Sequence, residues 1–239
     1  MPAGIFDLGS TPQPGAVGVG FCGKLQTHGD FVQRRLPGLL VRCWEEWLDR
    51  SIAASRESLG EDWRALYLTS PIWRFAVSAG CCGDRPFAGV LMPSLDKFGR
   101  YHPLTIIAVL EQHTSASAVG LFSSDWYRRI ESLALSSLED DFQFDEFDAK
   151  LAMASSPNGT DIRAFGTGFQ TVAPAISLDH ALSTLIARII EASTLKYSLW
   201  WTVDAGEQFV FSCGYPGLPT PEDFAELLLA TTRPAEGAG

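Results

Sequence analysis

Three short apolar segments, separated by loops rich in Gly, Asp and Pro, constrain the fold more than any other feature of this sequence. They cover residues 72–78, 87–92 and 104–110 and are rich in aromatic and aliphatic side chains. Segments of this length and composition are typical of β-strands, and strands joined by short loops usually lie beside one another in a sheet. We therefore predict three neighbouring strands in the middle of the chain.

Amphipathic helices are predicted before and after these strands, because apolar residues recur at three- and four-residue spacing. The predicted helices are residues 39–59, a segment near 117–138, another near 145–154, the stripe from 177 to 190 and a short helix capped by Thr220. Further strands are predicted at residues 17–22, 162–165, 197–203 and 209–213, the last two as a hairpin.

This order of elements predicts an α+β fold, with one mixed, mostly antiparallel sheet of about six strands flanked by helices. The 239 residues, 46% of them hydrophobic, are enough to bury a large core. We expect residues 1–16 to form a flexible leader, residues 17–232 a single domain and residues 233–239 a disordered tail.

Charge and cysteine content exclude several classes of function. The chain has 28 acidic and 18 basic residues, a formal charge of −10, so nucleic-acid binding is not expected. No apolar run is long enough to span a bilayer and no signal peptide is visible, which predicts a cytoplasmic protein without membrane insertion. In that reducing compartment the five cysteines would be free thiols: Cys22, Cys43, Cys81, Cys82 and Cys213.

Catalytic and metal-binding motifs are incomplete. Gly18-x-x-x-x-Gly23-Lys24 approaches a phosphate-binding loop, but Leu25 stands where that loop needs Ser or Thr to bind magnesium. Cys81-Cys82 next to glycines is a nucleophile candidate only if the fold brings His102 near as its base. The four histidines lack metal-binding spacing. We predict no catalytic residues, no metal and no cofactor.

Two segments punctuated by glycines and charges have no packing explanation. Residues 20–37 read GFCGKLQTHGDFVQRRLP, and residues 93–105 read PSLDKFGRYHPLT. Together with PIWRF at residues 71–75 and the helix that carries Trp44 and Trp47, they strongly resemble the TagF (ImpM) family associated with type VI secretion. The specific resemblance covers roughly residues 18–110, and a weaker one includes Trp200 and Trp201.

The resemblance implies a non-enzymatic cytoplasmic protein that represses type VI secretion after translation. It implies binding to a scaffold with a forkhead-associated domain, in a threonine kinase and phosphatase pathway, and neither metal nor cofactor. The family tends to have Pro and a basic residue where this chain has Gln26 and His28. If this loop contacts the partner, His28 would weaken the contact or make it pH-dependent.

Several charged and aromatic side chains are candidates for partner binding. Not all of the charges in residues 24–35 can be buried without a large desolvation cost. We favour partner contact for Lys24, Arg34 and Arg35. For Asp30, Asp96 and Arg100 the alternative is a structural clasp between the two segments. The full set of candidates is Lys24, His28, Asp30, Phe31, Arg34, Arg35, Asp96, Arg100, Trp200 and Trp201.

Two hypotheses from different classes follow. The first is a regulatory binding protein of type VI secretion. The second is a small-molecule or nucleotide-binding enzyme that uses the loop of residues 18–24.

Overall fold

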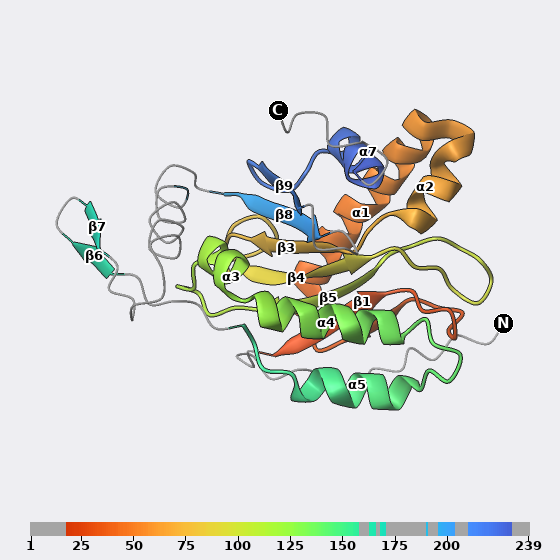
Figure 1. The fold of residues 1–239 in the computed structure, drawn as a ribbon, viewed down its shortest axis with the longest axis horizontal. Helices are drawn as coiled ribbons and strands as arrows, with labels where there is room; N and C mark the ends of the chain where they lie inside the picture. The colour runs from red at the N-terminus through yellow and green to blue at the C-terminus, as the bar shows by residue number, and fades with distance from the viewer. Residues whose placement is uncertain are drawn as a thin grey trace.

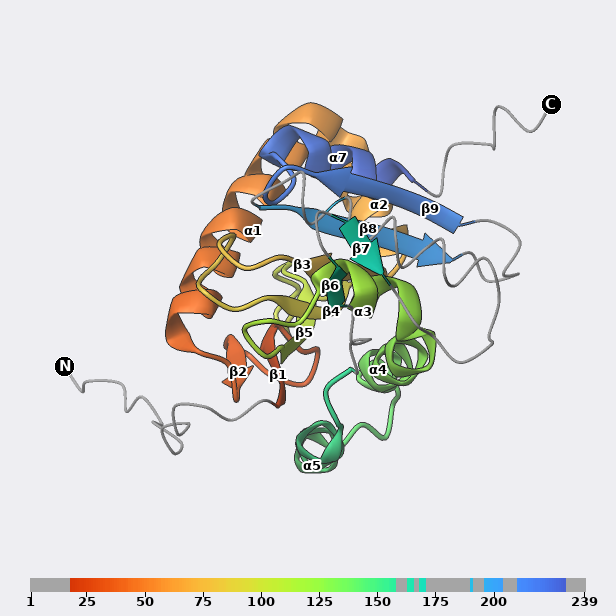
Figure 2. The same ribbon diagram turned by 90° about the vertical axis from the view of Figure 1, so that its left-hand side faces the viewer.

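The computed structural model of the protein describes residues 18–157, 163–165, 168–170, 190, 196–203 and 210–230. A seven-stranded sheet lies between two layers of helices, and every strand pair in it is antiparallel (Figures 1 and 2). The strand order is β2-β1-β5-β4-β3-β8-β9. The predicted α+β class is confirmed, with one strand more than expected.

The strands of this sheet are β1 (Val19–Gly23), β2 (Val32–Arg34), β3 (Trp73–Val77), β4 (Phe87–Met92), β5 (Leu104–Val109), β8 (Ser198–Val203) and β9 (Val210–Tyr215). Strands β6 (Arg163–Phe165) and β7 (Gly168–Gln170) pair as a separate two-stranded sheet. Strands β4 and β5 are buried along their whole length because helices cover both of their faces. Their continuous apolar sequences follow from that position.

One helical layer consists of α1 (Gly38–Leu59), the 3-10 turn Gly60–Asp62, α2 (Trp63–Thr69) and α7 (Pro221–Leu229). Helix α1 presents Trp44, Trp47 and Leu48 to the sheet, where they meet Phe75 and Trp200 in one core cluster. Helix α7 begins at a capping box, in which the Thr220 side chain and the Asp223 side chain each bond the other residue's backbone N–H. This confirms the predicted C-terminal helix.

The opposite layer consists of α3 (Ala116–Phe122), α4 (Ser124–Ser136) and α5 (Phe144–Met153). Its core cluster includes Phe21, Val90 and Ile106 from the sheet and Trp126 and Tyr127 from α4. The single helix predicted near residues 117–138 is two helices, since the chain leaves helical geometry at Ser123, with φ −111° and ψ 33°.

The predicted helix at 177–190 lies almost entirely outside the described residues, as do the leader, the tail and the turn between β8 and β9. Within the described part of the chain, no helix combines the length and apolar character that crossing a membrane requires.

Candidate functional site

Two loops from different parts of the chain meet at one end of the sheet, at the right of Figure 1. Residues 24–31 connect β1 to β2, and residues 93–103 connect β4 to β5. The Lys97 backbone N–H donates to the His28 carbonyl at 3.0 Å, and the Ser94 hydroxyl donates to the Lys24 carbonyl at 2.8 Å. The two segments that carry the sequence motif therefore form one surface.

Glycines allow this close approach. Gly23 has φ +128°, and a Cβ there would lie 2.1 Å from the Pro103 carbonyl oxygen. A Cβ on Gly29 would lie 2.7 Å from side-chain carbons of both Lys97 and Phe98. A larger residue at Gly23 would push the two loops apart, whereas one at Gly29 would displace the side chains of Lys97 and Phe98.

Asp96 is the buried centre of the loop pair. Its Oδ1 accepts the backbone N–H groups of Phe98 and Arg100, each at 2.9 Å. Its Oδ2 lies 2.6 Å from Arg100 Nε and 3.2 Å from Lys24 Nζ. Burial raises the pKa of this carboxyl, but the hydrogen bonds from Arg100, Lys24 and the Phe98 backbone outweigh that effect and hold the pKa well below its usual range.

These contacts favour the clasp over direct partner contact for Asp96, whose side chain has no exposed surface. Arg100 belongs to the clasp and also donates to the Gly29 carbonyl, yet 57% of its side chain remains exposed. Asp30 is exposed, and no ion pair links it to another residue in the described ranges. Lys24 is only 17% exposed and faces Asp96, so it serves the clasp.

The exposed part of this surface includes aromatic and cationic side chains, beside the carboxylate of Asp30. The Phe98 side chain is 68% exposed, and Phe31 is 39% exposed. Lys97 Nζ lies 5.1 Å and Arg100 Cζ 5.4 Å from the centre of the Phe98 ring. We call Phe31, Lys97, Phe98 and Arg100 the loop apex. Phe98 and Lys97 were not among the predicted site residues, although an aromatic residue inside a polar, glycine-containing loop was a usable signal.

The two arginines of the motif have different roles. Arg35 has a left-handed backbone, with φ 57°, and its Nε donates to the Val19 carbonyl at 2.9 Å. Its Nη1 lies 2.5 Å from Asp148 of α5, so the side chain ties that helix to the sheet. Arg35 is thus engaged within the protein, and its contact with a partner stays a prediction. Arg34 is exposed, with its guanidinium 5.3 Å from the Phe144 ring centre.

His28 lies beside the Phe144 ring, with a distance of 4.5 Å between the two ring centres. Burial, followed by the neighbouring charges of Arg34 and Lys97, lowers the pKa of His28. The imidazole is therefore neutral at pH 7 and adds no charge to the surface there.

The adjacent tryptophans point to opposite faces of β8. Trp200 is fully buried against Trp44, with the two rings stacked 6.0 Å apart. Its prediction as a partner-binding residue is therefore wrong, because no partner can reach it. Trp201 is partly buried on the other face and meets the Tyr127 ring at 4.8 Å. Both tryptophans serve mainly the packing of helices on the sheet.

The segment whose sequence approaches a phosphate-binding loop is a buried strand. Residues 19–23 form β1, whose backbone pairs with β5 on one side and β2 on the other. A phosphate site needs backbone N–H groups that are free to point at the ligand. Because the sheet uses this backbone, the loop proposed for the enzyme hypothesis does not form.

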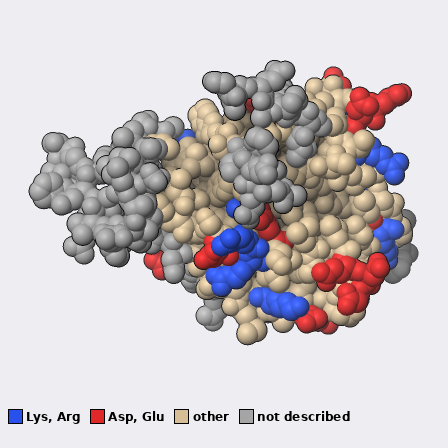
Figure 3. All heavy atoms as spheres, in the orientation of Figure 1, with Lys and Arg blue, Asp and Glu red and all other residues tan. Residues whose placement is uncertain are grey.

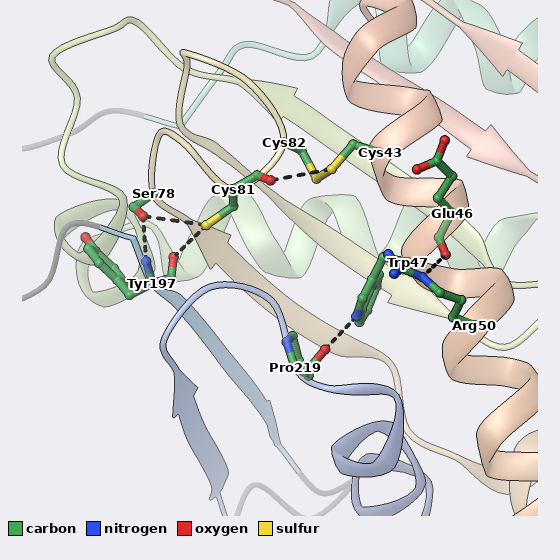
Figure 4. The surroundings of a disulfide bond; sticks show 9 residues. All are labelled: Cys43, Glu46, Trp47, Arg50, Ser78, Cys81, Cys82, Tyr197 and Pro219. Atoms are coloured by element: carbon green, nitrogen blue, oxygen red, sulfur yellow. Dashed lines mark hydrogen bonds between the residues drawn. A yellow bond between two sulfur atoms is a disulfide. The ribbon is translucent and has the colours of Figure 1, made fainter.

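The cysteine pair also differs from expectation. Cys82 forms a disulfide with Cys43 of α1, which corrects the prediction that all five cysteines are free (Figure 4). Figure 4 shows Cys81 beside Ser78 and Tyr197, and burial raises the pKa of its thiol. His102 Nε2 lies 2.9 Å from Glu45 Oε2, so this histidine is engaged elsewhere. Among the described residues, no cluster of three or more His, Cys, Asp or Glu has a metal-binding arrangement.

Comparison with known proteins identifies the family. Residues 20–154 match the model of the TagF N-terminal domain, described as type VI secretion system-associated. The chain is also similar to a solved structure, PA0076 from Pseudomonas aeruginosa PAO1, with 33% sequence identity and a TM-score of 0.75. That match covers 88% of this chain and 93% of the other. No curated protein matches. This chain therefore belongs to the TagF family of type VI secretion system-associated proteins.

Proposed function

We propose that this protein is a non-enzymatic, post-translational repressor of bacterial type VI secretion. In this proposal it acts in the cytoplasm by binding a scaffold protein with a forkhead-associated domain, within a threonine kinase and phosphatase pathway. The observation that carries the proposal is the family match, because residues 20–154 include both loops of the candidate site.

The geometry of the site supports binding rather than catalysis. The side chains that sequence reasoning considered for chemistry already have partners: Lys24 faces Asp96, Cys82 is bonded to Cys43, and His102 faces Glu45. The loop pair is held by hydrogen bonds and exposes an aromatic ring that has two cations near it. A preformed, projecting surface of this kind is suited to contact with another protein.

A secretion assay with a binding assay tests the proposal. Deleting the gene is expected to raise the amount of type VI substrate in the medium, and restoring the gene should lower it again. Purified protein should retain the forkhead-associated scaffold from cytosol. Unchanged secretion, together with no retention by folded protein, would refute the proposal.

Calorimetry addresses the enzyme hypothesis separately. We expect no heat of binding with millimolar ATP or GTP, because β1 occupies the segment that would hold the phosphates. Saturable heat with either nucleotide would contradict the non-enzymatic proposal.

A further inference from the structure

The loop apex combines features that rarely occur together on an exposed surface. Phe98 leaves 68% of its side chain in water, although an aromatic ring gains free energy from burial. Lys97 and Arg100 both lie near that ring, and Phe31 in the other loop is a second exposed aromatic residue, whose ring meets His102 at 5.7 Å. Aromatic residues and arginine are the types that most often dominate binding energy at protein interfaces.

The charge of the apex is opposite to that of the whole chain. The protein carries a formal charge of −10, and only 19% of its residues are charged. On the face drawn in Figure 3, charged side chains form small separate groups on a mostly uncharged surface. The loop pair carries three cations, Lys24, Lys97 and Arg100, and two carboxylates, the exposed Asp30 and the buried Asp96, of which Asp96 pairs with Lys24 and Arg100. The apex is therefore locally positive on an acidic protein.

The apex is also preformed. Asp96 fixes the backbone at Phe98 and Arg100, and Leu95 forms a β-bridge with Tyr101 across the base of the loop. Little conformational entropy would be lost when a ligand orders such a loop.

We infer that the loop apex docks an acidic protein segment that carries an aromatic or large aliphatic side chain. Phe98 and Phe31 would cover the apolar side chain, while Lys97 and Arg100 would pair with flanking carboxylates. If the segment belongs to the forkhead-associated scaffold, the inference rests on the proposed function and places the scaffold's binding surface at the loop apex.

The hydrogen bonds favour carboxylates over a phosphate group. A phosphate is usually held by backbone N–H groups together with converging cations. Here the backbone N–H groups of Phe98 and Arg100 already donate to Asp96. Lys97 and Arg100 lie beside the ring and are suited to separate carboxylates along a peptide.

The first test compares scaffold binding by Lys97→Glu and Phe98→Ala with binding by two control variants. Lys150→Glu makes the same charge change on α5, and Met153→Ala removes an apolar side chain that is 86% exposed. We expect each apex variant to weaken binding roughly tenfold or more, and each control to stay within about twofold. Binding by Lys97→Glu should also show less dependence on salt concentration.

The outcomes separate the two proposals. If the unaltered protein does not bind the scaffold, the scaffold-binding part of the proposed function fails. If it binds and the apex variants bind equally well, the scaffold contact has another location and the apex inference is refuted.

A second test does not depend on the scaffold. The unaltered protein is titrated with the peptide Asp-Glu-Trp-Asp-Glu, and NMR follows the backbone amides of residues 97–100. We expect saturable shifts of these amide signals with this peptide, but not with Asn-Gln-Trp-Asn-Gln or with vesicles of anionic lipid. Absence of shifts with the acidic peptide, or equal shifts with the neutral peptide or the vesicles, overturns the inference.

Discussion

At the scale of single residues, Asp96 is the side chain on which the candidate site depends most. Its carboxylate is buried and accepts hydrogen bonds from two backbone N–H groups and two cations. Asp96→Asn would leave Lys24 and Arg100 without their counter-charge. We expect the melting temperature to fall by roughly 5–10 °C in a thermal unfolding experiment.

The matched control is Asp30→Asn, which makes the same change in the neighbouring loop. Asp30 is exposed and has no ion pair within the described ranges, so its replacement should alter the melting temperature by about 1 °C or less. Equal effects of the two variants would contradict the role of Asp96 as a clasp.

A second residue-scale prediction concerns His28. Lys97 lowers the pKa of this histidine, so Lys97→Ala should raise it toward the ordinary value, whereas Lys150→Ala should not, because Lys150 pairs with Glu146. An NMR titration of the His28 ring measures both. Because the pKa of His28 is lower in the folded state, the unfolded chain binds this proton first as the pH falls through about 6.5. The free energy of unfolding therefore decreases as the pH falls below that value. An unchanged pKa in Lys97→Ala would refute this coupling.

The residues of the site were only partly predictable from sequence. Glycine and charge placement indicated that residues 20–37 and 93–105 belong together, and the clasp through Asp96 was one of two stated alternatives. Sequence could not show that Arg35 pairs with Asp148, because 113 residues separate them and only the fold brings them together. Phe98 was missed because exposure of an aromatic side chain depends on the loop geometry that Asp96 imposes.

At the scale of elements, apolar patterns predicted the long strands and helices well. Strands β3, β4 and β5 and helix α1 lie within one or two residues of their predicted ends. Strand β2 was missed because it has only three residues, two of them exposed. The break at Ser123 was missed because the apolar pattern continues through it.

The disulfide between α1 and the loop before β4 gives an element-scale prediction. It links residues 39 positions apart, so removing it frees a long loop in the unfolded chain. The double variant Cys43→Ser/Cys82→Ser should lose about 2–4 kcal/mol of unfolding free energy, measured by urea denaturation. Reductant should lower the stability of the unaltered protein similarly, because it converts this pair to thiols.

Cys81→Ser is the matched control for this variant. Cys81 is adjacent to Cys82 but forms no disulfide, and its sulfur lies 3.8 Å from the Tyr197 carbonyl oxygen and 3.9 Å from the Ser78 hydroxyl. Its replacement should cost less than about 1 kcal/mol. A double variant as stable as this control, with or without reductant, would show that the bond does not contribute to the fold.

At the scale of the whole molecule, the sheet extends beyond the range matched by the family model. That range ends at residue 154, yet β8 pairs directly with β3, in a register that places Phe75 opposite Trp200. Trp47 donates from Nε1 to the Pro219 carbonyl at 2.8 Å, and Trp73 donates to the Leu227 carbonyl at 3.3 Å. The C-terminal elements therefore complete the core cluster that α1 begins.

This arrangement predicts that a fragment ending at residue 157 does not fold stably. Removing β8, β9 and α7 would expose the edge of β3 and much of the apolar surface of Trp44, Trp47 and Phe75. Burial of each of these large side chains contributes about 1.5–3 kcal/mol to stability. We expect the fragment to aggregate or to lack a cooperative thermal transition. A chain ending at residue 230 should keep its melting temperature within about 2 °C. A cooperative, monomeric fragment ending at residue 157 would show that the N-terminal part folds independently of the strands that complete its sheet.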